Sequence, residues 1–275
     1  MSMLARQRQD EILAQVSRTG AVKVADLCAV LGVSDMTIRR DFKELVERGL
    51  VERVHGGVAL PRGASVHEPG FEAKSTREPR AKVAIARAAA RLVRPGTCVG
   101  ISGGTTTHAF ACELLDVPGL TVVTNSLPVA DRFHDGGRTD QTVLLTGGQR
   151  TPSMALVGPL TVAALERLHM DTLFLGTHGL DVESGLTCPN LLEAQTNQAM
   201  AAASRRVVVL ADHTKWGVTA IAGTLKLSEI DIVITDAALD RGARETLAGR
   251  VGDLIIAPDT TTADPPSQGE GNGHV

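Results

Sequence analysis

The sequence predicts a protein of two domains, a small helical N-terminal domain with a hairpin and a larger α/β domain with a mainly parallel sheet. Three observations lead to this prediction. The length of 275 residues suits two domains. The first 60 residues contain three helical apolar patterns and a glycine-containing hairpin. Beyond residue 80, short apolar runs alternate with helical segments. We expect domains over residues 1–60 and 80–258, a linker over 61–79 and a disordered tail over 259–275.

The N-terminal domain begins with two helices, which the spacing of their apolar residues predicts. A helix is expected over residues 3–17, followed by the extended piece AVK. Apolar residues at offsets of 0, 3, 4 and 7 from Val24 indicate a second helix of about two turns. Gly32 and Val33 then make a tight turn, which leads directly into a third helix.

The third helix, beginning at Ser34, is predicted to bury one face and to expose a short basic one. The Ser34 hydroxyl suits the helix start, because it can accept hydrogen bonds from free backbone amides, and Gly49 suits the helix end. The buried stripe consists of Ile38, Phe42, Leu45 and Val46. The exposed face carries Met36, Thr37, Arg40 and Lys43, with Arg39 on its flank.

A hairpin follows the third helix. LVERV and VAL flank His55-Gly56-Gly57, where the glycines can supply positive φ. Two helices around a glycine turn, followed by a hairpin, form the pattern of a winged helix-turn-helix, whose last helix enters the major groove of DNA. Two other interpretations remain open. One is a protein-binding module, and the other is a helical bundle end in which Arg40 pairs with Glu44 and Arg39 with Asp41 or a loop.

Composition permits DNA binding without favouring it. The net charge is −3, and the first 60 residues hold 9 basic against 8 acidic residues, a balance of +1. DNA binding would therefore depend on the placement of a few cations. Aromatic residues make up only 2% of the chain, too few for platforms that stack single-stranded nucleic acid.

The cysteines, the histidines and the apolar runs limit which metal sites and which membrane segments the sequence allows. The four widely spaced cysteines form no CxxC pair, and no two histidines have metal-ligand spacing on one helix, so we expect no metal site and no cofactor. Free thiols, an N-terminus unlike a leader and the lack of a long apolar run predict a soluble, cytoplasmic protein without a membrane segment.

Residues 61–79 are rich in proline, glycine and charge without periodicity, as in an interdomain linker. Phe71, a lone aromatic in this stretch, is expected to dock on one of the domains. The alanine-rich stretch over residues 80–93 predicts the first helix of the larger domain.

Seven apolar runs after residue 93 predict strands that are buried on both faces of a sheet. They are short, continuous and rich in β-branched residues, and helical segments separate them. The runs are CVGIS, LTVVTN, TVLLTG, DTLFLGT, RVVVLAD, DIVITD and DLIIAP. The helical segments follow Thr105, surround Leu127, and cover residues 161–169, 191–204 and 238–248.

A ligand is expected at the carboxyl ends of these strands, where loops lead into helices. The run CVGIS leads through Gly103-Gly104-Thr105-Thr106-Thr107 into a helix. Glycines allow close approach of the backbone, and threonine hydroxyls with free amides at a helix start suit phosphate. A plain strand-to-helix turn is the alternative. The GK[ST] of a P-loop and the GxGxxG fingerprint are absent from the sequence.

Other strand ends carry further polar candidates. Asn125-Ser126 follows the second run, and Asn125 or Glu193 is suited to bind sugar hydroxyls. Lys215 would offer a point charge to a phosphate, although the pattern alone favours a solvated surface lysine there. For His178 and His213 the pattern favours ordinary loop histidines.

Residues 3–60 resemble the winged helix-turn-helix of the DeoR family of bacterial transcriptional regulators. The matching pieces are RQRQDEIL, VKVADLCAVLGVS, MTIRRDFKEL and GLVERVHGGVAL, and TIRRD together with RVHGG is very specific. The resemblance implies sequence-specific binding to double-stranded DNA, with wing contacts to the backbone or minor groove from Arg53 and His55. The helix residues that it places against DNA are Ser34, Met36, Thr37, Arg39, Arg40 and Lys43.

The resemblance continues over about residues 81–236, to the sensor domain of the same family, whose sheet is similar to that of ribose-5-phosphate isomerases and CoA transferases. The matching pieces include GGTTT, LLTGGQ, GLTCPNLLEAQTNQAM and ADHTKWG. One departure concerns Ser102, because many members have an aspartate at that position, two residues before the glycine of GTT. The resemblance implies a phosphorylated sugar as effector, bound by Gly103, Gly104, Thr105, Thr106, Thr107, Asn125, Ser126, Glu193 and Lys215.

These features together predict a DNA-binding transcriptional regulator, a repressor of a carbohydrate-metabolism operon that responds to a phosphorylated sugar. A homo-oligomer, dimer or tetramer, is expected because one small helix-turn-helix seldom supplies enough affinity for DNA. The alternative is a sugar-phosphate isomerase with an accessory DNA-binding head, with Asp212, Asp181 or Glu193 as the base. We expect no enzymatic activity, because similarity of fold does not carry chemistry with it.

Overall fold

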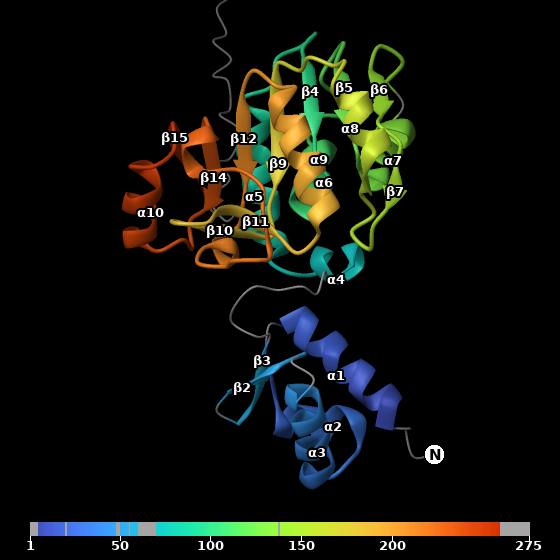
Figure 1. The fold of residues 1–275 in the computed structure, drawn as a ribbon, viewed down its shortest axis with the longest axis vertical. Coiled ribbons are helices and arrows are strands. Elements are labelled where there is room, and N and C mark those ends of the chain that lie inside the picture. The colour runs from blue at the N-terminus through green and yellow to red at the C-terminus, as the bar shows by residue number, and fades with distance from the viewer. Residues whose placement is uncertain are drawn as a thin grey trace, which may run out of the picture.

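The computed structural model describes residues 5–19, 21–47, 50–54, 56–59, 70–136 and 138–258, and Figure 1 shows their arrangement. The predictions for Gly49, His55, residues 60–69 and the tail over 259–275 lie outside these residues. In the described part of the chain, no helix is long and apolar enough to cross a membrane.

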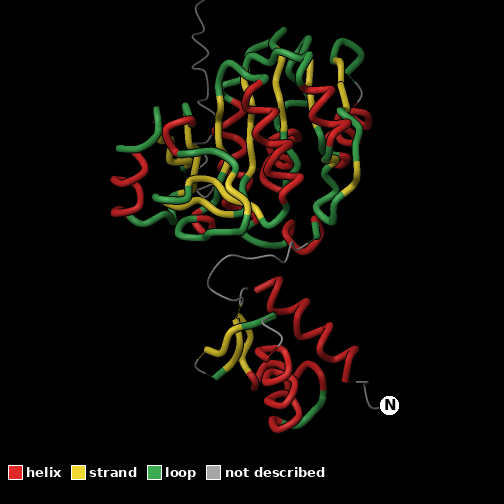
Figure 2. The backbone as a smooth tube through the Cα atoms, in the orientation of Figure 1, coloured by secondary structure: helices red, strands yellow, loops and turns green. Residues whose placement is uncertain are grey.

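The N-terminal domain contains the predicted helices and hairpin (Figure 2). Its helices share one core, in which Ile12, Leu27, Ile38 and Leu45 are fully buried. The extended AVK piece pairs with the second strand of the hairpin, which gives a three-stranded antiparallel sheet of order β1-β3-β2. The elements are α1 (Ala5–Thr19), β1 (Ala21–Lys23), α2 (Val24–Leu31), α3 (Asp35–Glu47), β2 (Glu52–Val54) and β3 (Gly57–Ala59).

Two glycines shape the hairpin for different reasons. Gly56 has a φ of +75°, as predicted for the turn. The prediction of a positive φ was wrong for Gly57. A Cβ on Gly57 would lie 2.0 Å from the carbonyl oxygen of Val22, so the close pairing of β1 with β3 requires glycine there.

The seven predicted apolar runs form one parallel sheet of order β15-β14-β12-β9-β4-β5-β6. The chain extends from the central pair in opposite directions, through β5 and β6 on the β4 side and through β12, β14 and β15 on the β9 side. The boundary between β4 and β9 is therefore the topological switch point, where open α/β sheets bind ligands. The strands are β4 (Cys98–Ile101), β5 (Thr121–Thr124), β6 (Thr142–Leu145), β9 (Thr172–Gly176), β12 (Val207–Leu210), β14 (Ile232–Asp236) and β15 (Asp253–Ala257).

Helices cover both faces of this sheet and make three layers (Figure 1). One core joins α5, α6 and α7 to one face, and another joins α8, α9 and α10 to the other. Successive strand residues alternate between the faces, so Val208 lies in the first core and Val209 in the second. The helices are α5 (Pro79–Ala90), α6 (Thr105–Cys112), α7 (Leu127–Gly136), α8 (Pro159–Leu165), α9 (Leu191–Ala202) and α10 (Arg241–Ala248).

The expected linker contains a helix, α4 (Phe71–Ser75). Phe71 docks on the larger domain, as predicted: its ring stands edge-on to the ring of His108 in α6, with centroids 5.5 Å apart. The Phe71 amide also donates to the carbonyl oxygen of Pro152 at 3.2 Å. Residues 70–79 therefore belong structurally to the larger domain.

Two further features of the larger domain differ from the prediction. Burial on both faces was wrong for β6, because it is an edge strand, and Leu144 and Leu145 are 41% and 42% exposed. Short antiparallel strands were not predicted, since each is too brief to show a period of two. They are β7 (Gln149–Arg150) with β8 (Leu156–Val157), and β10 (Gly179–Asp181), β11 (Gly185–Cys188) and β13 (Ala222–Gly223).

Candidate nucleic-acid interface and ligand pocket

The outer face of α3 is the first candidate site. Ser34 caps the helix as predicted, because its Oγ accepts a hydrogen bond from the Thr37 amide at 3.3 Å. Met36 is 81% exposed, and the side chains of Arg40 and Lys43 are 83% and 71% exposed. The polar residues predicted from the helical period are thus accessible to a large partner.

Each cation on this face pairs with an acid one helical turn away. In the bundle interpretation Arg39 was expected to pair with Asp41 or a loop, and its partner is Asp35 instead. Exposed pairs at this spacing contribute little net stability, because solvent screens them, so they can open when a phosphate or a base edge offers a better acceptor. The pairs are Arg39 with Asp35, Arg40 with Glu44 at 3.6 Å, and Lys43 with Glu47 at 3.8 Å.

Asp41 faces the interior of the domain and holds α3 against α1. Its carboxylate accepts two hydrogen bonds from Arg8, with Nη2 to Oδ1 at 3.0 Å, and only 3% of its side chain is exposed. Gln9 adds a hydrogen bond to Glu44 at 2.7 Å. The last residue of TIRRD therefore orients the exposed helix, a role that the sequence analysis did not assign.

The wing lies beside this helix. Arg53 is exposed in the middle of β2, whereas His55, the other predicted contact residue, lies outside the described residues. Val58 of β3 is fully buried and pairs with Val22 of β1. The wing is thus anchored in the same core as the helices.

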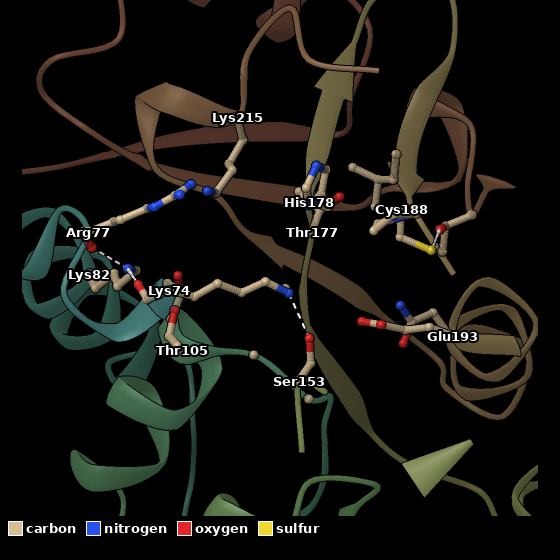
Figure 3. Close-up of a pocket in the computed structure, with 18 residues that line it drawn as sticks. Lys74, Arg77, Lys82, Thr105, Ser153, Thr177, His178, Cys188, Glu193 and Lys215 are labelled. Atoms are coloured by element: carbon tan, nitrogen blue, oxygen red, sulfur yellow. Dashed lines mark hydrogen bonds between the residues drawn. The ribbon is translucent and has the colours of Figure 1, made fainter. Parts of the chain in front are cut away.

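A pocket lies at the switch point of the large sheet (Figure 3). The loops after β4 and β9 contribute Gly103, Gly104 and Thr177 to its lining. The α4–α5 segment forms one wall, and the start of α9 with Glu193 forms another. Lys215, from the short helix after β12, completes it. Segments that are far apart in the sequence therefore build one site.

Four cationic side chains line this pocket, and the chain holds them in defined places. Lys74 donates to the Ser153 Oγ at 2.7 Å. Lys82 is only 5% exposed, and its Nζ donates to the carbonyl oxygens of Lys74, at 2.7 Å, and of Arg77. Lys82 thereby fixes the segment that carries the other two side chains. Lys215 Nζ lies 3.8 Å from Asp212.

Burial opposes the charged forms of these cations. It lowers the pKa of Lys82 to about 8, with Asp212 opposing that change and Lys215 and Arg77 adding to it. Burial likewise lowers the pKa of Lys215 and the pKa of Arg77. The Nε and Nη2 atoms of Arg77 are buried and have no hydrogen-bond partner in the described part of the chain. The protein therefore compensates this charge incompletely, as in sites that bind anions.

The start of α6 adds backbone donors to the cations. Gly104 has a φ of +151°, and a Cβ on Gly103 would lie 2.6 Å from the Cβ of Ala155. The hydrogen bond from His108 to the carbonyl oxygen of Gly104, at 3.0 Å, begins the helix. The amides of the three residues before His108 have no intrahelical acceptor, and a helix start of this kind attracts anions.

Six of the nine predicted effector-binding residues line the pocket. Lys215 lines it although the pattern alone favoured a solvated surface lysine, and 24% of its side chain is exposed. His178 also lines it, whereas His213 hydrogen-bonds through Nδ1 to Asp236 at 2.9 Å. The six are Gly103, Gly104, Thr105, Thr106, Glu193 and Lys215.

The other three, Thr107, Asn125 and Ser126, do not line the pocket and make bonds that support its loops. Thr107 Oγ1 donates to the carbonyl oxygen of Gly104 at 3.0 Å. Asn125 accepts from the Gly103 amide at 2.9 Å and donates to a carbonyl of β8 at 3.0 Å. Ser126 Oγ accepts from an amide in the first turn of α7 at 3.4 Å. These internal partners were not predicted, and direct contact of the three residues with an effector stays a prediction.

Ser102, where many members of the resembled family have aspartate, is also buried behind the pocket. Its Oγ accepts from the Gly176 amide at 3.0 Å, so it ties the end of β4 to the end of β9. The residue is fully buried and does not line the pocket. In this chain the position joins two strands.

The sequence analysis missed Lys74, Arg77, Lys82 and Ser153. The first two come from a stretch interpreted as linker, and Lys82 comes from a helix defined by its alanines. The available signal was the density of cations in KSTREPRAK, which is high for the start of an apolar helix. No local pattern indicated that they converge on the loop after β4.

Comparison with known proteins places both domains. A family model for the DeoR-like helix-turn-helix domain matches residues 8–63, and one for the DeoR C-terminal sensor domain matches residues 77–237. A ribose 5-phosphate isomerase A from Methanocaldococcus jannaschii has 17% sequence identity and a TM-score of 0.36, covering 49% of this chain and 53% of that chain.

Full-length relatives are named as regulators. The HTH-type transcriptional regulator GlpR of Haloferax volcanii is 39% identical over 89% of this chain and 95% of its own length. The HTH-type transcriptional regulator YgbI of Escherichia coli K12 is 36% identical over 93% and 99%. The glycerol-3-phosphate regulon repressor of the same organism is 35% identical over 86% and 92%. These names are of regulators rather than enzymes, in contrast to the isomerase alternative. The chain belongs to the DeoR family and is a DNA-binding transcriptional regulator.

Proposed function

We propose that this protein represses an operon of carbohydrate metabolism and that a phosphorylated sugar in the pocket controls its binding to operator DNA. One observation carries the proposal: the pocket joins the free amides of α6 to four cations of which none is fully exposed. Such a combination suits a phosphate. A relative named as the repressor of a glycerol-3-phosphate regulon supports a phosphorylated carbohydrate as the effector class.

The wall opposite the cations suits the remainder of a sugar. Glu193 and Asn197 lie one turn apart on α9 and both line the pocket. Asn190 caps this helix by accepting hydrogen bonds from the Leu192 and Glu193 amides, at 3.0 and 3.3 Å. Carboxylate and amide groups in fixed positions bind hydroxyls. A phosphate at α6 would leave the hydroxyls of the sugar facing α9.

Helix α4 offers a path from the pocket to the DNA-binding domain. It carries Lys74 into the pocket, and α1 approaches it, as Figure 1 shows. The buried pair between Arg8 and Asp41 joins α1 to α3. An effector that draws Lys74 and Arg77 would thus shift α4, then α1 and the exposed helix. Control of this kind requires that the effector bind two arrangements with different affinity.

The repressor is proposed to act as a homo-oligomer on repeated half-sites. A single helix-turn-helix contacts few base pairs, and a pair of them raises both affinity and specificity. In this arrangement a small shift of α1 in each subunit changes the spacing between two exposed helices. Loss of half-site register then releases the operator.

A gel-shift titration with DNA flanking the protein's own gene tests the proposal. We expect one retarded complex, which a panel of sugar phosphates dissolves selectively. Thermal unfolding of the full chain with the same compounds should show stabilisation by the same member of the panel, because a ligand of the native state stabilises it by mass action. Retardation that no phosphorylated sugar alters, without any thermal stabilisation, would remove the effector from the proposal.

A further inference from the structure

The pocket carries more positive charge than one phosphate site requires. Lys74, Arg77, Lys82 and Lys215 line it, and Glu193 is the acid among its lining residues. Asp212 lies behind Lys215 and offsets one charge without lining the pocket. On the side opposite α9, the cationic side chains therefore outnumber the acids of the described residues that offset them, and the backbone amides of α6 add to this positive potential.

These cations differ in what the protein offers them. Lys82 donates to two backbone carbonyls, and Lys74 donates to Ser153. Arg77 differs, because its Nε and Nη2 are buried and have no hydrogen-bond partner in the described part of the chain. Those two nitrogens form the edge of a guanidinium that binds a carboxylate through two parallel hydrogen bonds. Buried donors without acceptors are costly to a fold unless a ligand supplies the acceptors.

The cations also point to two different places, as Figure 3 shows. Arg77 extends toward Lys215. In addition to burial, repulsion by Arg77 lowers the pKa of Lys215, and repulsion by both lowers the pKa of Lys82. Lys74 leaves the same segment in another direction, toward Ser153 and the wall that holds Glu193. An effector with two anionic groups could therefore meet the start of α6 with Lys74 through one group and the free edge of Arg77 through the other.

We propose that the effector is a phosphorylated sugar acid, with its phosphate at the start of α6 and its carboxylate on Arg77 and Lys215. The inference rests on the proposed function and narrows its ligand class. The carboxylate accepts from Nε and Nη2 of Arg77, and Lys215 adds a second charge from the opposite side. Sugar phosphates that have no carboxylate fill the first position and leave the second without an anion.

Matched pairs of compounds test the inference by calorimetric titration of the full-length protein. The pairs are erythrose 4-phosphate with 4-phosphoerythronate, ribose 5-phosphate with 5-phosphoribonate, and glycerol 3-phosphate with 3-phosphoglycerate. Within the pair whose carbon chain gives the tightest binding, we expect the acid to bind at least about tenfold more tightly than its partner. Charge-assisted bidentate hydrogen bonds to the carboxylate then add to the phosphate contacts. Equal affinity within every pair would overturn the inference and leave the sugar-phosphate effector intact.

Two variants assign the preference to Arg77. In Arg77→Met, the affinity for the phosphorylated acid should fall toward that for the matched compound without a carboxylate. Arg77→Lys should restore the difference only in part, because lysine lacks the planar fork. Arg80→Met is the matched control, since Arg80 is exposed on the next helix and does not line the pocket. Thermal unfolding without ligand checks that each variant is folded. An unchanged ratio of the two affinities in folded Arg77→Met would contradict the assignment.

Two further outcomes separate this inference from the broader one. If fructose 1,6-bisphosphate binds more tightly than every acid, the group on Arg77 is a second phosphate rather than a carboxylate. That result would overturn the inference. Absence of binding by all of these compounds, inorganic phosphate included, would overturn the proposed effector class together with the inference.

Discussion

The two candidate sites of this protein treat positive charge in opposite ways. On α3, Arg39, Arg40 and Lys43 each have an acid one turn away, and all of these pairs are exposed. In the pocket, cations are crowded in partly buried positions, and Nε and Nη2 of Arg77 have no acceptor among the residues that the structure describes. The first site can exchange its internal partners for DNA at low cost. For the second site, we propose that a bound anion supplies the missing acceptors of Arg77, so that its occupancy alters the structure around it.

The contrast between buried and exposed ion pairs within the DNA-binding domain gives the largest expected effect. Asp41→Asn should destabilise this domain by about 3–5 kcal/mol, because it removes the buried carboxylate that accepts two hydrogen bonds from Arg8. Asp35→Asn, which breaks an exposed pair with Arg39, should cost much less, because solvent screens that pair. Hydrogen exchange at the amides of α1 and α3 measures both. Similar protection in the two variants would contradict the distinction.

The next largest effect is expected on DNA binding, because the cations of α3 would exchange their acidic partners for DNA. Arg40→Glu should weaken operator binding by about 1–3 kcal/mol, which is about fivefold to more than a hundredfold, and should reduce the salt dependence of binding. Arg87→Glu is the control, because Arg87 forms an exposed pair with Glu113 on the larger domain, at 3.6 Å. Fluorescence anisotropy at several salt concentrations measures both variants. A smaller loss for Arg40→Glu than for Arg87→Glu would place the DNA elsewhere.

Uncompensated charge in the pocket predicts a pH dependence of effector binding. Burial lowers the pKa of Lys82 to about 8, so the free protein loses this proton as the pH rises through 8. A bound anion favours the charged lysine, and its binding above pH 8 therefore takes up a proton. Affinity should fall about fivefold between pH 8 and pH 9 if Lys82 alone titrates, and Lys215, whose pKa burial also lowers, acts in the same direction.

The sign for stability is opposite to that for effector affinity. A lysine with a lowered pKa in the folded state binds fewer protons than the unfolded chain between about pH 8 and its ordinary value. The free protein should therefore gain stability from this group as the pH rises through that window. Titration calorimetry of the effector in buffers of different ionisation enthalpy detects the proton uptake on binding.

Constant effector affinity from pH 7.5 to 9.5 would show that the lysines of the pocket stay charged without a ligand.

The smallest expected effect concerns the connection between the two sites. Phe71→Leu removes the edge-on contact with His108 and should destabilise the larger domain by about 0.5–1 kcal/mol. Effector affinity should change little, since neither residue lines the pocket. The effector concentration that releases DNA should rise, because α4 is held less firmly to α6. An unchanged release concentration would exclude this contact from the path.

The sequence predicted features that depend on neighbouring residues. The helical period placed the buried stripe of α3, Ser34 indicated its start, and continuous β-branched runs marked all seven strands of the parallel sheet. The turn from β4 into α6 was visible because two glycines and three threonines follow a strand directly. Each of these signals lies within about one or two turns of chain, where local geometry dominates.

Only the tertiary structure decided which of these pieces meet. The order of the strands places β4 beside β9, and this adjacency locates the pocket and hides Ser102 between the strand ends. It also turns Asn125 inward as a loop support and brings Lys215 to the pocket. Arg77 and Asp41 have no local pattern that reveals their places, because Asp41 pairs with a residue distant in sequence and Arg77 reaches the pocket only through the packing of distant segments. Sequence determined the elements, and packing between distant segments determined the site.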